Sequence, residues 1–117
     1  MGIFFWPMEV LSEDRRLATT VQAMVDTGSS YTVLPSEVLA RLSIRPTETR
    51  MFEMGDSRVV SLESGVAWVR VEGQEVIGVI VFGGEETTPL MGAELLQSAG
   101  LLVDSIAHRL IPRSSLL

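Results

Sequence analysis

The stretch from Leu17 to Asp26 constrains the fold more than any other part of the chain. Polar and apolar residues alternate along Leu17–Val25, and most are small or β-branched, which favours a strand over a helix. Asp26 follows at once and begins the run Asp-Thr-Gly-Ser-Ser. Asp and Gly favour turns, because Asp bonds to neighbouring backbone and Gly accepts positive φ. We therefore expect the Asp26 carboxylate where a strand ends, held by local N–H and O–H groups rather than by a basic side chain.

The remaining signals predict a mainly β protein. Expected strands lie at 3–10, 17–25, 31–34, 50–54, 58–62, 65–71, 76–82, 101–104 and 109–112, with a short apolar piece at 90–92. Short helices are expected at 38–42 and 93–99. Strands and helices do not alternate as βαβ units, so the expected class is all-β, a small barrel-like or sandwich-like fold. The length of 117 residues predicts a single domain over 1–117.

Charge and composition exclude several classes of function. The net charge is −6, and phosphate binding needs clustered basic residues, so a nucleic-acid partner is not expected. The chain has no Cys, which removes disulfides, zinc thiolates and Cys nucleophiles. His108 is the only histidine and reads best as a surface or strand-edge residue, so we expect no metal site and no cofactor.

Two features of the sequence bear on location. No run approaches the roughly 18 apolar residues of a membrane helix, so a membrane partner is not expected. The apolar stretch Met1–Pro7 lacks a positive flank and a small-residue cleavage site, which is unlike a signal peptide. These observations predict a cytoplasmic protein.

Three motifs occur in a characteristic order. They are Met24-Val25-Asp26-Thr27-Gly28-Ser29-Ser30, a glycine-bearing hairpin tip at Met54-Gly55-Asp56-Ser57, and Leu90-Met91-Gly92 before a helix. In this order and spacing, from about Leu17 to Ile111, the chain resembles the retropepsin-like aspartic proteases, the family of the retroviral protease. The resemblance implies a small closed-barrel-like retropepsin fold with one or two short helices, and an aspartic endopeptidase that acts on a peptide or protein substrate.

The resemblance also implies roles for particular residues. Asp26 would be the catalytic carboxylate, and the Thr27 hydroxyl would bond across a dimer axis. Gly28 would let backbone approach its partner and supply an N–H to the carboxylate, and Ser29 would bond to the outer carboxylate oxygen, although turn capping explains Ser29 and Ser30 equally well. The tip Met54, Gly55, Asp56 and Ser57 would form the substrate-binding flap, with a solvated hairpin as the alternative. Leu90, Met91 and Gly92 would pack beneath the active-site loop.

The single Asp-Thr-Gly motif links activity to dimerisation. Metal-free peptide hydrolysis needs a base that activates water and an acid that protonates the leaving nitrogen, and two carboxylates sharing a proton supply both. Asp14, Asp56 and Asp104 do not repeat the motif. The second carboxylate must therefore come from another copy of the chain, in a C2 homodimer.

Other interpretations remain open on the sequence alone. A retropepsin fold can act as a catalytically silent peptide-binding or dimerisation module. A β-barrel that binds nucleic acid is disfavoured by the charge. The apolar cluster Phe4, Phe5 and Trp6 belongs either to the core or to a dimer seam, which the tail 113–117 would also influence.

Overall fold

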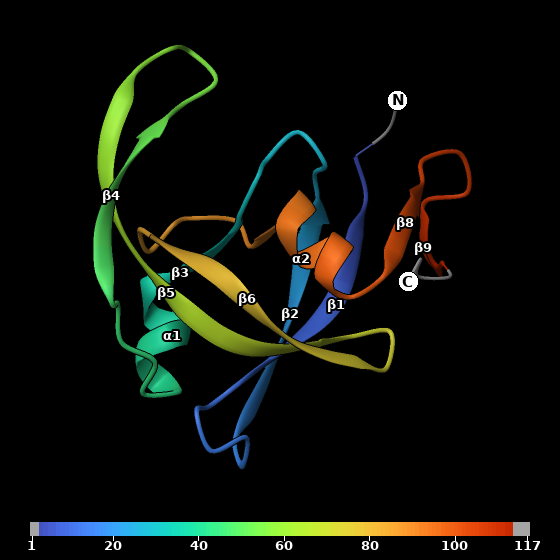
Figure 1. Cartoon of the computed structure of the whole chain (residues 1–117), viewed down its shortest axis with the longest axis horizontal. Coiled ribbons are helices and arrows are strands. Elements are labelled where there is room, and N and C mark those ends of the chain that lie inside the picture. Colours follow the sequence, from blue (N-terminus) through green and yellow to red (C-terminus); the bar gives the residue numbers. More distant parts are fainter. Residues whose placement is uncertain (1–2, 114–117) are drawn as a thin grey trace.

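The computed structural model describes residues 3–113, and that range contains nine strands and two short helices (Figure 1). The elements are β1 (Phe5–Leu11), β2 (Ala18–Val25), β3 (Thr32–Pro35), α1 (Ser36–Arg41), β4 (Glu48–Glu53), β5 (Val59–Val71), β6 (Gln74–Gly83), β7 (Leu90–Met91), α2 (Ala93–Ser98), β8 (Leu101–Asp104) and β9 (Arg109–Pro112). The expectations that involve residues 1–2 and 114–117 lie outside the described residues.

Six strands form a closed ring, in the order β1-β2-β7-β3-β6-β5. The ring closes where Glu9–Leu11 of β1 pair with Trp68–Arg70 of β5. Pro7 of β1 lies outside this closing contact and pairs only with Gln22 of β2. A proline is accommodated there because one side of the strand needs no N–H donor at that position. Strands make up 52% of residues 3–113 and helices 11%, so the prediction of a mainly β, barrel-like fold is confirmed.

Strand β5 differs from the expectation. The sequence pattern predicts separate strands at 58–62 and 65–71, but the structure has one strand over Val59–Val71. Ser64 is only 1% exposed and continues the pairing toward β6, opposite Val81. At Gly65 an added Cβ would lie 3.0 Å from the carbonyl oxygen of Arg45, so this position passes close under the 45–46 backbone. The polar residues Glu63 and Ser64 therefore belong to one continuous strand, and Gly65 marks a close packing contact instead of a chain turn.

The β4–β5 hairpin extends out of the ring, because β5 continues past its pairing with β6 (Figure 1). Its outer strand β4 pairs with β5 alone. The root of the hairpin therefore continues a ring strand, and its tip projects away from the ring.

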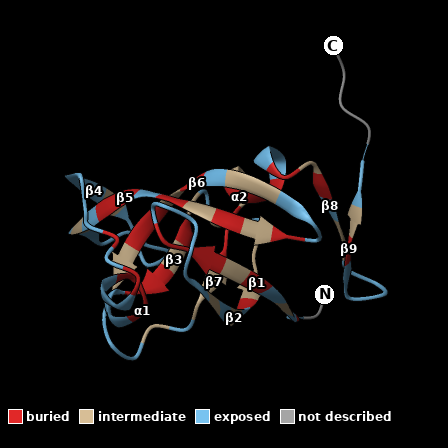
Figure 2. Cartoon of the chain, turned by 90° about the horizontal axis from the view of Figure 1, so that it is seen from below, coloured by how far each residue is buried: buried red, intermediate tan, exposed pale blue. Residues whose placement is uncertain are grey.

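The core fills the inside of the ring and is sealed by the two helices (Figure 2). Completely buried side chains include Met8, Val10, Leu34, Leu39, Ile80, Met91 and Leu95. Burial of each such side chain stabilises the fold by about 1.5–3 kcal/mol. Helix α2 is seated on β6, where a Cβ at Gly78 would lie 2.9 Å from Leu95 Cδ1 and the Val79 N–H donates to Glu94 Oε1 at 3.1 Å.

Strands β8 and β9 form a separate two-stranded sheet, on the side of the molecule opposite the β4–β5 hairpin (Figures 1 and 2). The N-terminal aromatic cluster divides between core and surface, since Phe4 is buried and Phe5 is 50% exposed. The Phe4 ring stacks on His108 at 5.3 Å between centroids and so links the β8–β9 turn to the start of β1. His108 is exposed, as expected. Neither helix in residues 3–113 is long and apolar enough to cross a membrane.

The β8–β9 turn provides a prediction for acid stability. The Asp104 carboxylate accepts bonds from the N–H groups of Ala107 (3.0 Å) and Ile106 (3.1 Å) and pairs with Arg109 at 3.2 Å. The N–H of Ala107 is the largest cause that lowers the Asp104 pKa, and the Arg109 pair adds to it. A carboxyl whose pKa is lower in the folded state stabilises the fold above its unfolded value and loses that effect as pH falls through the folded value. We expect Asp104→Asn to lower the free energy of unfolding at pH 7, with the difference from wild type shrinking below about pH 4. Urea unfolding at several pH values measures this, and a difference independent of pH would contradict it.

Candidate active site

Asp26 lies at the point where β2 leaves the ring, and backbone bonds fix its main chain from two sides. The N–H of Val25 donates to the carbonyl of Phe4, and the N–H of Asp26 donates to the carbonyl of Met91, both at 3.0 Å. The carboxylate oxygen Oδ1 accepts the N–H of Gly28 at 2.9 Å. The structure therefore places the carboxylate at a strand end, with a local N–H donor. Within residues 3–113 no ion pair involves Asp26, whose side chain is partly exposed.

The segment Leu90-Met91-Gly92 and the start of α2 support this loop from below. Strand β7 pairs in parallel with β2 and antiparallel with β3, so it fills the gap between the strands on either side of the loop. The N–H of Ala93 donates to the carbonyl of Ser29 at 2.8 Å, and that of Glu94 donates to the carbonyl of Ser30 at 2.9 Å. The first N–H groups of a helix have no partner within it, so the loop carbonyls satisfy these donors.

Gly92 packs closely against the backbone of the Asp26 loop. Its N–H donates to the hydroxyl of Thr32, which is fully buried, at 3.2 Å. A Cβ at Gly92 would lie 2.4 Å from the carbonyl oxygen of Tyr31 and 2.9 Å from that of Ser29. Real Cβ atoms do not approach backbone so closely, so only glycine fits at this position without displacing the loop.

Thr27 and Ser29 are placed differently from each other. Thr27 is exposed. The Ser29 hydroxyl donates to the carbonyl of Tyr31 at 2.9 Å, so in this structure it stabilises the turn and does not donate to the carboxylate of Asp26. The difference arises because the chain folds back after Ser29 and brings the Tyr31 carbonyl within reach. Turn capping, the alternative interpretation of Ser29, describes this contact.

A groove of about 930 Å³ lies between the Asp26 loop and the β4–β5 hairpin. Its lining is mostly apolar, and its polar side chains are those of Asp26, Ser29, Ser30, Tyr31, Glu53 and Thr87. The other lining residues are Gly28, Val33, Met51, Phe52, Met54, Gly55, Val60, Leu62, Val81, Gly83, Gly84 and Leu90. A cleft with a carboxylate on its loop side and mostly apolar walls suits a peptide chain with apolar side chains.

The structure separates the four predicted flap residues into two pairs. Met54 and Gly55 line the groove, whereas Asp56 and Ser57 do not. Asp56 instead accepts the N–H of Arg58 at 3.1 Å and pairs with its guanidinium at 2.7 Å, and Ser57 takes a positive φ of 70°. Asp56 and Ser57 therefore build the tight turn at the tip of the hairpin.

Several groove residues were not predicted. The rings of Tyr31 and Phe52 pack against each other in the groove wall, with ring centroids 6.3 Å apart and nearly perpendicular planes. Val33, Val60 and Val81 contribute wall from three different strands. The alternation of residues along a strand assigns each side chain to one face of that strand. It does not predict which faces of distant strands will line the same groove.

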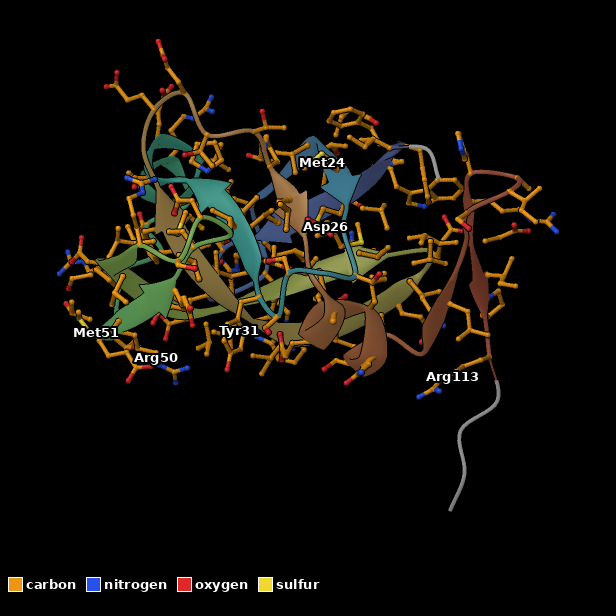
Figure 3. The ribbon with its side chains drawn as sticks, turned by 90° about the horizontal axis from the view of Figure 1, so that it is seen from above. Met24, Asp26, Tyr31, Arg50, Met51 and Arg113 are labelled. Atoms are coloured by element: carbon orange, nitrogen blue, oxygen red, sulfur yellow. The ribbon has the colours of Figure 1, made fainter. Side chains whose placement is uncertain are left out.

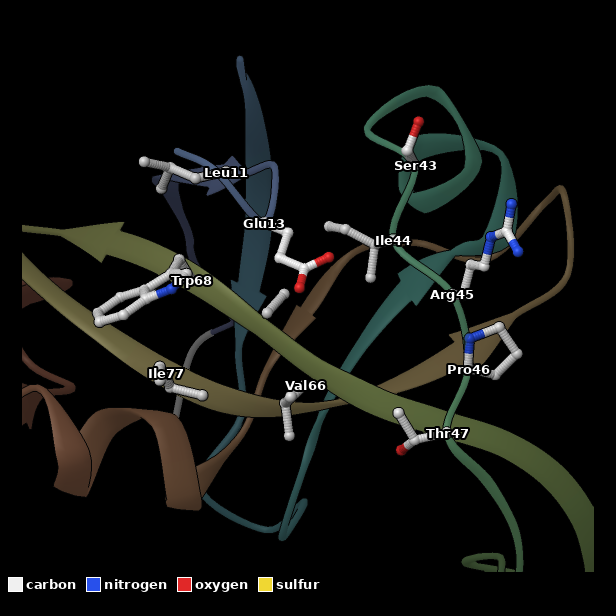
Figure 4. Close-up of a pocket in the computed structure, with 11 residues that line it drawn as sticks. Leu11, Glu13, Ser43, Ile44, Arg45, Pro46, Thr47, Val66, Trp68 and Ile77 are labelled. Atoms are coloured by element: carbon white, nitrogen blue, oxygen red, sulfur yellow. The ribbon is translucent and has the colours of Figure 1, made fainter. Parts of the chain in front are cut away.

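A second pocket lies away from Asp26 (Figure 4). It measures about 350 Å³, and its walls include Ile44, Val66, Trp68 and Ile77, with Glu13 and Arg45 alongside. None of the predicted site residues lines it. In residues 3–113 the His, Cys, Asp and Glu side chains form no group of three that could hold a metal ion.

A comparison with known protein families gives a match over most of the chain. The family model described as aspartyl protease matches residues 12–105, which include β2, the Asp26 loop, the β4–β5 hairpin and α2. The chain belongs to the aspartyl protease family. This family is part of the retropepsin-like clan, so the resemblance noted on the three motifs is confirmed. A search of curated protein sequences gives no match. Membership in the aspartyl protease family supports a protease-type function.

Proposed function

We propose that this aspartyl protease family member is an endopeptidase that activates water between the Asp26 carboxylates of two identical chains. The observation that carries the proposal is the composition of the groove. Asp26 of the Asp-Thr-Gly loop and the hairpin-tip residues Met54 and Gly55 line the same space. A carboxylate on one side and a free hairpin tip on the other side can hold an extended peptide and exclude water around it.

The reaction needs one carboxylate in each protonation state. The ionised Asp26 takes a proton from water, and the water oxygen attacks the peptide carbonyl carbon. The protonated Asp26 of the other chain donates its proton to the carbonyl oxygen and so forms a gem-diol. The first Asp26, which now holds the proton from water, protonates the peptide nitrogen, while the second Asp26 takes a proton from a gem-diol hydroxyl. The C–N bond breaks, and an amine and a carboxylic acid leave. Two carboxylates about 3 Å apart hold a single proton between them, as this cycle requires.

The loop geometry supports a symmetric pair. Thr27 is exposed, and the preceding residue Asp26 is partly exposed. Both can meet their counterparts if a two-fold axis passes next to the turn. Glu53 also lines the groove, but it lies on β4 at the exposed hairpin, whereas the main chain of Asp26 is fixed by the barrel. A fixed carboxylate is the better acid or base, because catalysis depends on the position of the proton-transfer group.

Turnover should therefore depend on the concentration of the chain. Below the dissociation constant of the dimer, a tenfold dilution should lower the activity per chain by about tenfold, because the dimer fraction falls by mass action. Mass spectrometry of a diverse peptide mixture across a dilution series measures this, with sedimentation on the same samples and a statine-type transition-state inhibitor as the specificity control. Constant activity per chain in samples that sediment as monomers would reject the shared site. A monomer that binds peptides without cleaving them would favour the silent-module alternative.

A further inference from the structure

We propose that Tyr31 is a positioning residue that clasps the outer flap strand β4 to the catalytic loop, and so controls how the groove closes over Asp26. This inference rests on the proposed function for its consequence in catalysis. The clasp itself is a property of the fold and can be measured without activity. In the view of Figure 3, Tyr31 lies between Asp26 and Arg50.

The backbone of Tyr31 is held tightly. Its carbonyl oxygen accepts the Ser29 hydroxyl at 2.9 Å, and the backbone of Gly92 lies against the same carbonyl. The next residue, Thr32, is fully buried and accepts the N–H of Gly92. The ring of Tyr31 therefore projects from a rigid base that is continuous with the Asp26 loop.

The ring of Tyr31 contacts β4 at two alternate residues. The Phe52 ring meets it edge to face, at 6.3 Å between centroids and 82° between planes. The guanidinium carbon of Arg50 lies 5.8 Å from the centroid of the Tyr31 ring, within the range of a cation–π contact. Arg50 also pairs with Glu48 on the same strand, which holds the guanidinium near the ring. Residues two apart on a strand share a face, so one side of β4 lies against Tyr31.

These contacts matter because β4 has little other support. It is an edge strand whose ladder runs to β5 alone. At the tip, the bonds from Met54 N to Arg58 O (2.7 Å) and from Ser57 N to Met54 O (2.9 Å) stay within the hairpin. The Tyr31 ring thus ties the outer flap strand to the part of the barrel that carries Asp26.

The clasp lies in the wall of the groove. Tyr31 and Phe52 both line the groove, together with Asp26. An opening of the hairpin that carries β4 away from the loop must break the contact between the two rings. Closure restores the contact and rebuilds that part of the peptide-binding wall. Tyr31 therefore couples the flap position to the shape of the groove.

Hydrogen exchange of the whole chain tests the clasp directly. Tyr31→Ala should raise amide exchange in residues 48–62 by roughly fivefold to tenfold, the expected loss of an aromatic pair and a cation–π contact. Exchange in β1, β3 and β6 should stay unchanged. Tyr31→Phe keeps the ring and should stay close to wild type. Unchanged hairpin exchange in Tyr31→Ala, or an equal increase throughout the barrel, would overturn the proposal.

A second variant tests the same contact from the flap side. Phe52→Ala alters a hairpin residue outside the core, so the barrel should remain folded. It should raise exchange in the hairpin by less than Tyr31→Ala does, because the contact between Arg50 and the Tyr31 ring remains. The double variant should add little to Tyr31→Ala, because that single change already removes the contact between the two rings. Fully additive effects would show that the two rings act independently and would reject the clasp.

Peptide kinetics then separate this inference from the proposed function. If the wild type cleaves peptides, Tyr31→Ala should raise KM by roughly fivefold to tenfold, the factor expected for hairpin opening, with a smaller change in kcat. Tyr31→Phe should restore the wild-type KM. An unchanged KM in Tyr31→Ala would remove the catalytic role of the clasp. A wild type without cleavage would defeat the proposed endopeptidase activity, and the exchange result would still decide whether the clasp exists.

Discussion

Asp26→Asn is expected to abolish peptide cleavage, with a fall in kcat/KM of roughly 10⁴-fold or more. In a symmetric dimer this one substitution removes both the base and the acid. The amide of Asn can still accept the Gly28 N–H through its oxygen, so the loop should keep its shape. Cleavage of the peptide mixture by purified wild type and variant, together with sedimentation, provides the measurement. The variant should remain folded and retain the oligomeric state of the wild type.

Asp14→Asn is the matched control for that experiment. It makes the same chemical change in the turn between β1 and β2, where the Asp14 carboxylate accepts the Ser12 hydroxyl at 2.7 Å. Its activity should stay within about twofold of wild type, because surface changes away from a site have small effects. Cleavage that persists in Asp26→Asn would show that another group performs the chemistry. Loss of cleavage in both variants would point to general damage rather than to a role for Asp26.

Gly92→Ala is expected to destabilise the fold by about 3 kcal/mol and to displace the Asp26 loop. The added Cβ would lie 2.4 Å from the Tyr31 carbonyl oxygen and 2.5 Å from its carbonyl carbon. These are backbone atoms of a loop that is fixed by hydrogen bonds, so a change of side-chain rotamer cannot relieve the overlap. The N–H bonds of Ala93 and Glu94 to Ser29 and Ser30 would lengthen as the segments separate. Urea unfolding gives the change in stability, and peptide cleavage reports the displacement of the loop.

Gly84→Ala is the control for the glycine substitution. A Cβ at Gly84 would meet nothing within 4 Å, although Gly84 lies in the loop that borders the same groove. Its free energy of unfolding should differ from wild type by less than about 0.5 kcal/mol. Equal free energies of unfolding for Gly92→Ala and Gly84→Ala would contradict the prediction, because they would mean that the backbone around Gly92 accommodates a Cβ without loss of stability.

Local patterns predicted most of the secondary structure. The alternation over Leu17–Val25 predicted a strand, and β2 covers Ala18–Val25. Pro35 and Gly100 marked the start of α1 and the end of α2, and Gly100 takes a φ of +66° directly after the last helical turn. These signals act over a few residues, because they arise from backbone torsion preferences and hydrogen bonds between near neighbours.

Prediction was weaker wherever a contact joins distant segments. A bond to the Asp26 carboxylate and turn capping both suited Ser29 on the sequence alone, and its hydroxyl donates to the Tyr31 carbonyl. Two predicted strands are the single strand β5, because Ser64 is buried and continues the ladder. Tyr31 was assigned to a short strand segment and was not expected to meet Phe52. In each case several local partners were compatible with the sequence, and the packing of the barrel selected one.

The sequence by itself determined the chemistry that this protein has available. It has one Asp-Thr-Gly, no Cys and a single His, and its strand pattern sets Asp26 at the end of β2. Those properties follow from residue type and from neighbours along the chain. Only the tertiary structure decided what surrounds the Asp26 loop: the backbone of Gly92 against Ser29 and Tyr31, the groove that Asp26 lines, and the Tyr31 ring against β4. These contacts depend on the packing of strands and loops that lie far apart in the chain.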